Sequence, residues 1–462
     1  MIRTAFLVLV LSLLPRSAFA EAAQFLGKVV GKVACTADLT QSYALYLPSD
    51  YTAEKKWPII FCFDPRARGI VPVERLRAAA EKFGWIVVGS NNSRNGPWSD
   101  NAVAMRAVLQ DAETHLAMDP QRIYAAGMSG GARVATQLGL SGRIRGVIGC
   151  SAGFPVMPDG VPRKVPFIFF GTAGTTDFNY REMQRLENEL EVRHVTHRIV
   201  FFEGSHEWAS AELLAEAIEW MEIQAMRAGV RRKDDAMIQA SLKSRLAALD
   251  SKPAGPAWAE LKSIVADFRG LSETLDLERK LKSLDSSREV SAWQRAERNR
   301  AHREDDLATT MNDVVESGSV NAIRAFAADL RRAADAPDDS PDRQMAQRMI
   351  AGVVSWSRES GRASIEDRNY GEAVSWLELT VALRPLQSHA WFDLARAYAL
   401  DGDKKQALRA LQEAAKAGYS DAAHAEAEPA FAKLRREGVS QQALAAMRAN
   451  PAEPARSSRE RP

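Results

Sequence analysis

The sequence predicts an α/β domain followed by an all-α helical-repeat domain, and three observations carry this prediction. Strand-like and helix-like segments alternate over residues 27–228, as in a mostly parallel sheet with flanking helices. Past residues 231–235 the strand-like runs end, and Ala, Leu, Glu, Arg and Lys dominate, as in stacked helices. A spacing of 34 residues then recurs near the C-terminus.

The elements of the α/β part follow from its apolar patterns. Short apolar runs between turn residues predict strands at residues 29–35, 42–47, 58–63, 86–90, 123–125, 146–150, 165–170 and 197–202. Apolar residues at helical spacing predict helices at residues 73–83, 101–117, 132–140 and 213–226. The first two strands are expected to pair through a turn near Asp38.

Length and charge bound the possible functions. A chain of 462 residues favours two or three domains. Its 61 basic and 59 acidic side chains give a net charge of +2, and 46% of its residues are apolar. This balance is typical of a globular protein with large cores and predicts no affinity for nucleic acid.

The N-terminus has the parts of a secretory signal peptide. Arg3 precedes an apolar core at residues 5–14, and Ala18-Phe-Ala20 is a small-residue cleavage site. The apolar core is short for a bilayer span and no Cys follows the cleavage site, so no stable membrane anchor is predicted. We expect an exported protein, periplasmic or secreted.

The segment Gly127-Met-Ser129-Gly-Gly131 matches the motif G-x-S-x-G and lies between an expected strand and an expected helix. A nucleophile elbow needs this context, because the turn lifts the serine oxygen out of the sheet and the glycines allow close backbone passage. The plainer interpretation is a serine in a glycine-rich turn. The flanking elements favour catalysis, with Ser129 as the candidate nucleophile.

An acid and a histidine follow Ser129, each just past the end of a strand. Asp177 closes the turn after residues 165–170, and His206 follows residues 197–202. Open parallel sheets bind ligands at these strand ends, and Ser, Asp, His is the chain order of this elbow geometry.

Other titratable residues are weaker candidates because of their positions. They are His115, His194, His197, Asp159, Glu187 and Glu189. His194 and His197 fall at the start of a strand, the opposite end from the expected site. Glu187 and Glu189 are expected on the solvated face of a charged helix.

The first half of the chain resembles a known family in its motifs and their order. The ending Gly204-Ser-His206-Glu-Trp208 is similar to the Gly-x-His-x-Trp ending of secreted esterases of the α/β-hydrolase superfamily. These include polyhydroxyalkanoate depolymerase-like and feruloyl-esterase-like enzymes. The resemblance implies an α/β-hydrolase domain with serine esterase activity.

Chemistry then gives each candidate a role. Ser129 would be the nucleophile, His206 its base, and Asp177 the group that orients the imidazole. The oxyanion needs two N–H donors, and the amide of Gly130 is expected as one. Relatives commonly carry His-Gly after the strand at residues 58–63, where this chain has Asp64 and Pro65. Because proline has no N–H, Arg66 is the candidate for the second donor.

Residues near the expected site are candidates for substrate binding. The loop at residues 91–98 leaves its strand on the same edge and contains Arg94 and Trp98. With Trp208, these side chains suit a polar or aromatic ester, small or polymeric, although an ordinary surface loop explains the same residues. Arg66, Arg68 and Arg94 together would favour an anionic substrate.

The cysteines and histidines predict neither metal nor cofactor. Cys62 and Cys150 lie in apolar strands and are expected as buried thiols, while a disulfide of Cys35 stays open. The sequence contains no Cys-x-x-Cys and no His-x-x-x-His.

The predicted organisation has five parts. They are the signal peptide (1–20), the α/β-hydrolase domain (21–228), a helical region of degenerate repeats or ordinary helices (229–345), tetratricopeptide-like repeats with a cap (346–448) and a disordered tail (449–462).

The repeat assignment depends on one unit in particular. It is carried by Trp391, Leu394, Ala395, Tyr398, Ala407, Leu411 and Ala414. This unit resembles the tetratricopeptide pattern, in which large residues of a first helix pack on small residues of a second. An ordinary amphipathic helix pair is the alternative.

The sequence therefore predicts an exported serine esterase whose helical repeats bind a protein partner or control access. An amidase or peptidase with the same triad is the near alternative. A non-catalytic interaction scaffold is the distant one, favoured by the missing His-Gly.

Overall fold

The computed structural model describes residues 25–157, 160–338 and 340–451. The chain divides into two compact units, Met1–Arg298 and Asn299–Pro462. The predicted signal peptide, Asp159 and residues 452–462 of the predicted tail lie outside the described residues.

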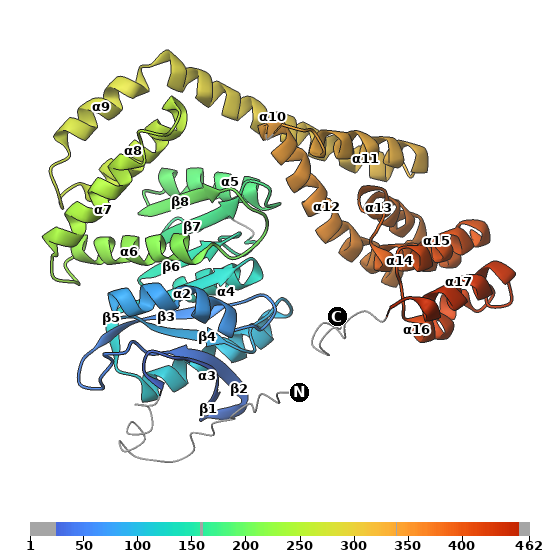
Figure 1. The fold of residues 1–462 in the computed structure, drawn as a ribbon, viewed down its shortest axis with the longest axis horizontal. Helices are drawn as coiled ribbons and strands as arrows, with labels where there is room; N and C mark the ends of the chain where they lie inside the picture. Colours follow the sequence, from blue (N-terminus) through green and yellow to red (C-terminus); the bar gives the residue numbers. More distant parts are fainter. Residues whose placement is uncertain (1–24, 158–159, 339, 452–462) are drawn as a thin grey trace. The chain divides into compact units, whose positions relative to one another are not determined.

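The first unit contains one eight-stranded sheet (Figure 1). Its strands are β1 (Val29–Cys35), β2 (Asp38–Tyr46), β3 (Trp57–Phe63), β4 (Ile86–Ser90), β5 (Met118–Met128), β6 (Gly146–Cys150), β7 (Ile168–Gly174) and β8 (His197–Phe202). They lie in the order β1-β2-β4-β3-β5-β6-β7-β8. β2 runs antiparallel to β1 and to β4, and the neighbouring pairs from β4 to β8 are parallel. This confirms the predicted mostly parallel sheet.

β1 is an edge strand with an irregular register. The register shifts between Val30 and Val33 and again between Ala34 and Cys35. Such irregularities bend a strand and increase its twist. The hairpin turns between Cys35 and Asp38, as predicted.

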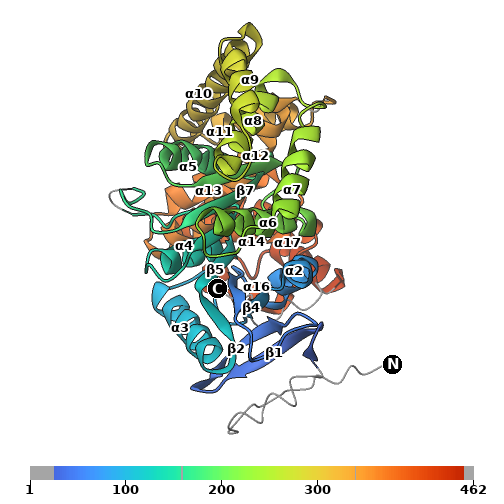
Figure 2. The same cartoon turned by 90° about the vertical axis from the view of Figure 1, so that its left-hand side faces the viewer.

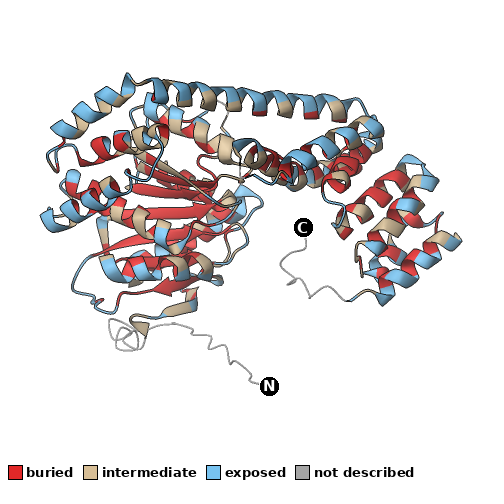
Figure 3. Cartoon of the chain, turned by 45° about the horizontal axis from the view of Figure 1, so that its top comes forward, coloured by how far each residue is buried: buried red, intermediate tan, exposed pale blue. Residues whose placement is uncertain are grey.

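Helices cover both faces of the sheet because its central strands are apolar on both sides. The flanking helices are α2 (Ile70–Phe83), α3 (Trp98–His115), α4 (Gly130–Gly139), α5 (Tyr180–Val192) and α6 (Ala211–Arg227). Figure 2 shows α3, α4 and α5 on one side and α2 and α6 on the other. In β3, Ile59 and Phe61 face the first layer, while Ile60 and Cys62 face the second. The strands are accordingly the most buried part of this unit (Figure 3).

β7 lies further along the chain than predicted. It spans Ile168–Gly174, not residues 165–170. The small residues expected to form a turn continue the ladder instead, and Gly174 pairs with Phe202 of β8. The turn that carries Asp177 therefore starts only after Gly174.

The first unit does not end at residue 228, where the sequence predicts a boundary. α7 (Asp235–Ala247) and α8 (Ala254–Phe268) pack on α6, and α9 (Leu275–Asp285) follows them. The buried Asp267 of α8 accepts hydrogen bonds from Trp220 Nε1 (2.7 Å), Gln224 Nε2 (3.0 Å) and Arg245 Nη1 (2.6 Å). These contacts join α6, α7 and α8 into one body, and the unit extends to Arg298.

The second unit is helical throughout its described residues. α10 (Arg288–Glu316) leads into it, followed by α11 (Val320–Ala334), α12 (Pro341–Glu366), α13 (Tyr370–Leu383), α14 (Ser388–Asp401), α15 (Lys404–Lys416), α16 (Ala422–Ala427), the 3₁₀ turn η3 (Pro429–Phe431) and α17 (Gly438–Ala449). None of the helices described for this chain is both long and apolar enough to cross a membrane.

α14 and α15 pack as the sequence predicts for a pair of helices. Leu394, Ala395 and Tyr398 of α14 share one buried cluster with Ala407 and Leu411 of α15. The two helices therefore bury apolar side chains in one common cluster. The tetratricopeptide assignment of these helices stays a prediction.

Candidate active site

Ser129 occupies a strained turn between β5 and α4. Its φ is 54° and its ψ is −122°, a backbone conformation that residues other than glycine rarely adopt. Space in the turn is minimal, because a Cβ on Gly131 would overlap the carbonyl of Phe63 in β3. The Ser129 amide donates to the Cys150 carbonyl at 2.8 Å, which fixes the turn to the end of β6. Strand, tight turn and helix therefore follow one another as the elbow motif predicts.

The three residues predicted to act together lie within hydrogen-bond distance. His206 Nε2 is 2.9 Å from Ser129 Oγ, and His206 Nδ1 is 2.8 Å from Asp177 Oδ1. Asp177 is buried and His206 is half-buried. Because a carboxylate only accepts, Nδ1 carries the proton and Nε2 is free to accept from the serine hydroxyl.

Two loops bring Asp177 and His206 together across neighbouring strands. A Cβ on Gly174 would overlap the Gly204 carbonyl, so glycine permits the loops to touch. Thr176 Oγ1 donates to that same carbonyl at 2.8 Å. The Asp177 carboxylate also accepts from the amide of Asn179 at 2.8 Å. Local backbone contacts thus hold the acid and the imidazole in register.

Phe178 stacks on the imidazole and was not anticipated from the sequence. Its ring centroid lies 3.9 Å from that of His206, with an angle of 27° between the planes. The stack restrains the ring of His206 and covers one of its faces. In the sequence, only the position of Phe178 next to Asp177 points to a role in the site. An aromatic residue after a turn is too common to predict such a role.

The oxyanion side of the site differs from the prediction at Arg66. The Gly130 amide is the first of α4, so it has no acceptor within that helix. The Arg66 amide, by contrast, already donates to Asp64 Oδ1 at 2.9 Å. Asp64 engages this amide as a turn-forming side chain, which makes Arg66 a poor second donor.

Trp208 is a buried structural residue, so the prediction that it binds substrate is not supported. Only 4% of its surface is exposed, and its indole N–H donates to Asp64 Oδ2 at 2.9 Å. Arg75 Nη1 donates to the next carbonyl, that of Ala209, at 3.0 Å. Both contacts hold the loop that carries His206.

The remaining predicted substrate residues lie on or beside the loop at residues 91–98. Trp98 is the first residue of α3 and is 47% exposed, while Arg94 is exposed. The backbones of Arg94 and Arg66 form an isolated bridge. Arg68 is bound through two nitrogens to Asp64 at 3.0 Å, which neutralises its charge and weakens the case for an anionic substrate.

The cysteines lie buried in the first unit as free thiols. Burial, with a smaller contribution from Asp111, raises the pKa of Cys35 to about 12. Burial also raises the pKa of Cys62 and of Cys150. All three are therefore unreactive, apolar packing residues. In the described part of the chain, no group of three His, Cys, Asp or Glu side chains is arranged to hold a metal ion.

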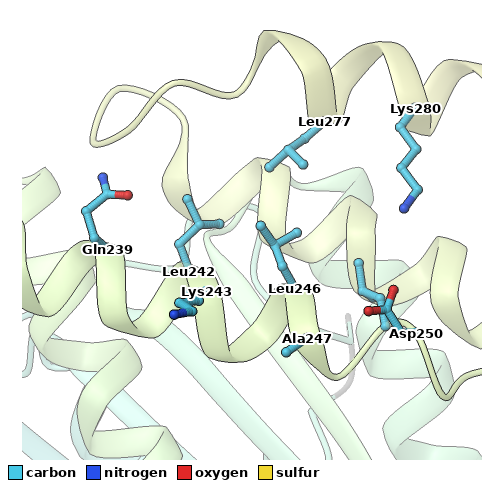
Figure 4. A pocket seen from close by; sticks show the side chains of 9 residues that line it. Gln239, Leu242, Lys243, Leu246, Ala247, Asp250, Leu277 and Lys280 are labelled. Carbon is cyan, nitrogen blue, oxygen red and sulfur yellow. The ribbon is translucent and has the colours of Figure 1, made fainter.

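A separate cavity of about 510 Å³ lies between α7 and α9 (Figure 4). Leu242 and Leu246 of α7 face Leu277 of α9 across it, with Lys243 and Lys280 beside them. The residues that line it belong to none of the loops at the strand ends, so this cavity is distinct from the site around Ser129.

No protein-family model and no curated protein sequence matches the chain. Part of it is similar to solved structures of hydrolases. An S-formylglutathione hydrolase from Staphylococcus aureus is 14% identical, with a TM-score of 0.33, and the match covers 39% of this chain and 90% of that one. A ferulic acid esterase is 19% identical, with a TM-score of 0.33, and the match covers 42% of this chain and 97% of that one. Esterase B from Lactobacillus rhamnosis is 15% identical, with a TM-score of 0.35, and the match covers 44% of this chain and 90% of that one.

Proposed function

We propose that this protein is a serine hydrolase that cleaves carboxylic esters through a covalent acyl-enzyme. The observation that carries the proposal is the relay from Ser129 Oγ to His206 Nε2, and from His206 Nδ1 to Asp177, at 2.9 and 2.8 Å. Nucleophile, base and orienting acid are each within hydrogen-bond reach, which is the geometry that this chemistry requires.

In the first half of the reaction, Ser129 Oγ attacks the ester carbonyl carbon as His206 takes the hydroxyl proton. The carbonyl electron pair moves to oxygen, and the Gly130 amide stabilises the resulting oxyanion. When the tetrahedral intermediate collapses, the C–O bond to the alcohol breaks and His206 returns the proton to the departing oxygen. A water molecule then repeats these steps on the acyl-enzyme and releases the carboxylic acid.

Ser129→Ala tests the proposal directly. We expect the wild type to react covalently with a fluorophosphonate probe and to hydrolyse p-nitrophenyl esters. The variant should lose labelling and at least about 10⁴-fold in kcat, as removal of a triad nucleophile does. A folded wild type that neither labels nor hydrolyses would favour the interaction scaffold, and undiminished turnover by Ser129→Ala would exclude this serine as the nucleophile.

The proposal extends to location and partners. Export to the periplasm or beyond is supported by the signal-peptide pattern at residues 1–20. The substrate class is a small-molecule or polymeric ester, with amides as the comparison in any screen. The helices of the second unit are proposed to bind a protein partner, a role supported by the 34-residue spacing. Fractionation and affinity capture with the full chain test these two points.

A further inference from the structure

Asn95 differs from the other asparagines around the loop that joins β4 to α3. Asn91 donates to the Gly31 carbonyl at 3.1 Å, and Asn92 donates to the Thr40 carbonyl at 3.1 Å. Each of these side chains holds the loop to the β1–β2 hairpin. The side chain of Asn95, by contrast, is exposed, and its amide makes no hydrogen bond to any residue that the structure describes.

The backbone of Asn95 is nevertheless held firmly. Its N–H donates to the Pro65 carbonyl at 2.9 Å, and the preceding Arg94 bridges to Arg66. The buried Asn101 of α3 accepts from the Arg94 amide at 3.1 Å and donates to the Arg94 carbonyl at 2.9 Å. The backbone of the loop is thus fixed on both sides, so the position from which the free Asn95 amide projects is fixed as well.

The Asn95 amide group lies against the residue that follows the nucleophile. A Cβ on Gly130 would overlap Asn95 Oδ1 and would lie 3.7 Å from Nδ2. Rotation about the terminal torsion exchanges the two ends of an amide at small cost, and the bound group decides which end faces it. Asn95 can therefore direct an N–H toward the space beside Ser129.

We propose that Asn95 Nδ2 is the second donor of the oxyanion hole, beside the Gly130 amide. This inference rests on the proposed serine hydrolase function. The usual source of the second donor, the backbone after β3, is compromised here: Pro65 has no N–H, and the Arg66 amide is engaged by Asp64. A side-chain N–H aimed at the carbonyl oxygen stabilises the charge that arrives there as the Ser129 Oγ–carbon bond forms.

The test compares Asn95→Ala and Asn95→Asp in the full chain. Asn95→Asp keeps the shape and removes the donor. Both variants should lower kcat about 10²–10³-fold and leave KM within a few-fold, because the contact forms only in the transition state. Their affinity for an alkyl boronic acid, which forms a tetrahedral adduct with the serine, should fall in parallel. Ser99→Ala, at the exposed start of α3, is the control and should match the wild type.

Several outcomes would overturn the inference. If the wild type hydrolyses esters and both Asn95 variants keep its kcat, Asn95 is not a donor and the hydrolase function stands. A raised KM with unchanged kcat would make Asn95 a ground-state substrate contact instead. A lowered melting temperature that accounts for the lost activity would make its role structural. A wild type inert toward esters and fluorophosphonates would overturn the hydrolase function and this inference with it.

Discussion

Asp64 is a single buried carboxylate that links two loops of the site. It accepts from the Trp208 indole, from the Arg68 guanidinium and from the Arg66 amide. A buried charge persists only where such partners surround it. Asp64 therefore orders the loop that follows β3, and it anchors the chain two residues beyond His206. This loop is thus held by side-chain contacts of Asp64, although it lacks a His-Gly pair.

Glu187 on α5 gives a prediction for pH. Glu187 is half-buried, and this burial, with repulsion from Glu191, raises its pKa from 4.5 to about 7. Because the unfolded chain loses this proton first, ionisation destabilises the fold progressively from about pH 4.5 to 7. We expect Glu187→Gln to raise the melting temperature at pH 8 and to leave it nearly unchanged at pH 4. Glu189→Gln on the same helix is the control, a position whose carboxylate pairs with Arg193 at 3.6 Å. An equal shift of the Glu187→Gln melting temperature at both pH values would contradict the prediction.

The connection between β5 and α4 is the element that most constrains the site. It joins the end of a central strand to a helix within one residue, and it brings α4 against the backbone of β3. The strain at Ser129 persists because the packed elements on both sides fix the path of the chain. The geometry of Ser129 is thus a property of the sheet and α4 together.

Gly131→Ala tests this constraint. The added Cβ would overlap the carbonyl oxygen of Phe63, which cannot move because it belongs to the backbone of a central strand. We expect the free energy of unfolding to fall by about 1–3 kcal/mol, or more, in urea denaturation, with loss of fluorophosphonate labelling. Gly31→Ala is the control, because its Cβ would meet a side-chain atom of Ile70 at an ordinary 3.5 Å. Wild-type stability of Gly131→Ala would mean that the turn is looser than described.

The first compact unit extends to Arg298, well past the end of the alternating strand and helix pattern at residue 228. α7 and α8 contribute Ile238, Leu242, Leu261 and Phe268 to a cluster with residues of α6. These helices are an integral layer of the first unit, and the helical composition past residue 231 concealed this.

Two truncated chains test that boundary. Residues 25–298 should fold cooperatively, whereas residues 25–228 should aggregate or melt roughly 10 °C or more lower, because the apolar side of α6 loses its cover. Trp220 and Gln224 would also lose their buried acceptor, Asp267. Circular dichroism melts and analytical gel filtration measure both effects. Equal stability of the two chains would place the boundary at residue 228 after all.

The sequence predicts those features of the fold and the site that depend on residues close together in the chain or on the ends of predicted strands. Strand cores such as β3 and β6 follow from apolar runs, and the meeting of Ser129, Asp177 and His206 follows from their places at the ends of parallel strands. The burial of Trp208, the occupied Arg66 amide and the placement of Asn95 depend on contacts between loops far apart in the chain. Such contacts leave no local pattern, because each partner alone resembles an ordinary loop residue.

The irregular register of β1 bears on how the protein behaves when concentrated. An open sheet ends in a strand with unpaired amides and carbonyls, which can template the addition of a strand from another copy. The register of β1 is interrupted at two places, and Lys32 lies within the first interruption, between Val30 and Val33. A strand from another copy would find an interrupted hydrogen-bonding pattern and a charged side chain at β1. This edge of the sheet therefore resists intermolecular strand pairing and aggregation.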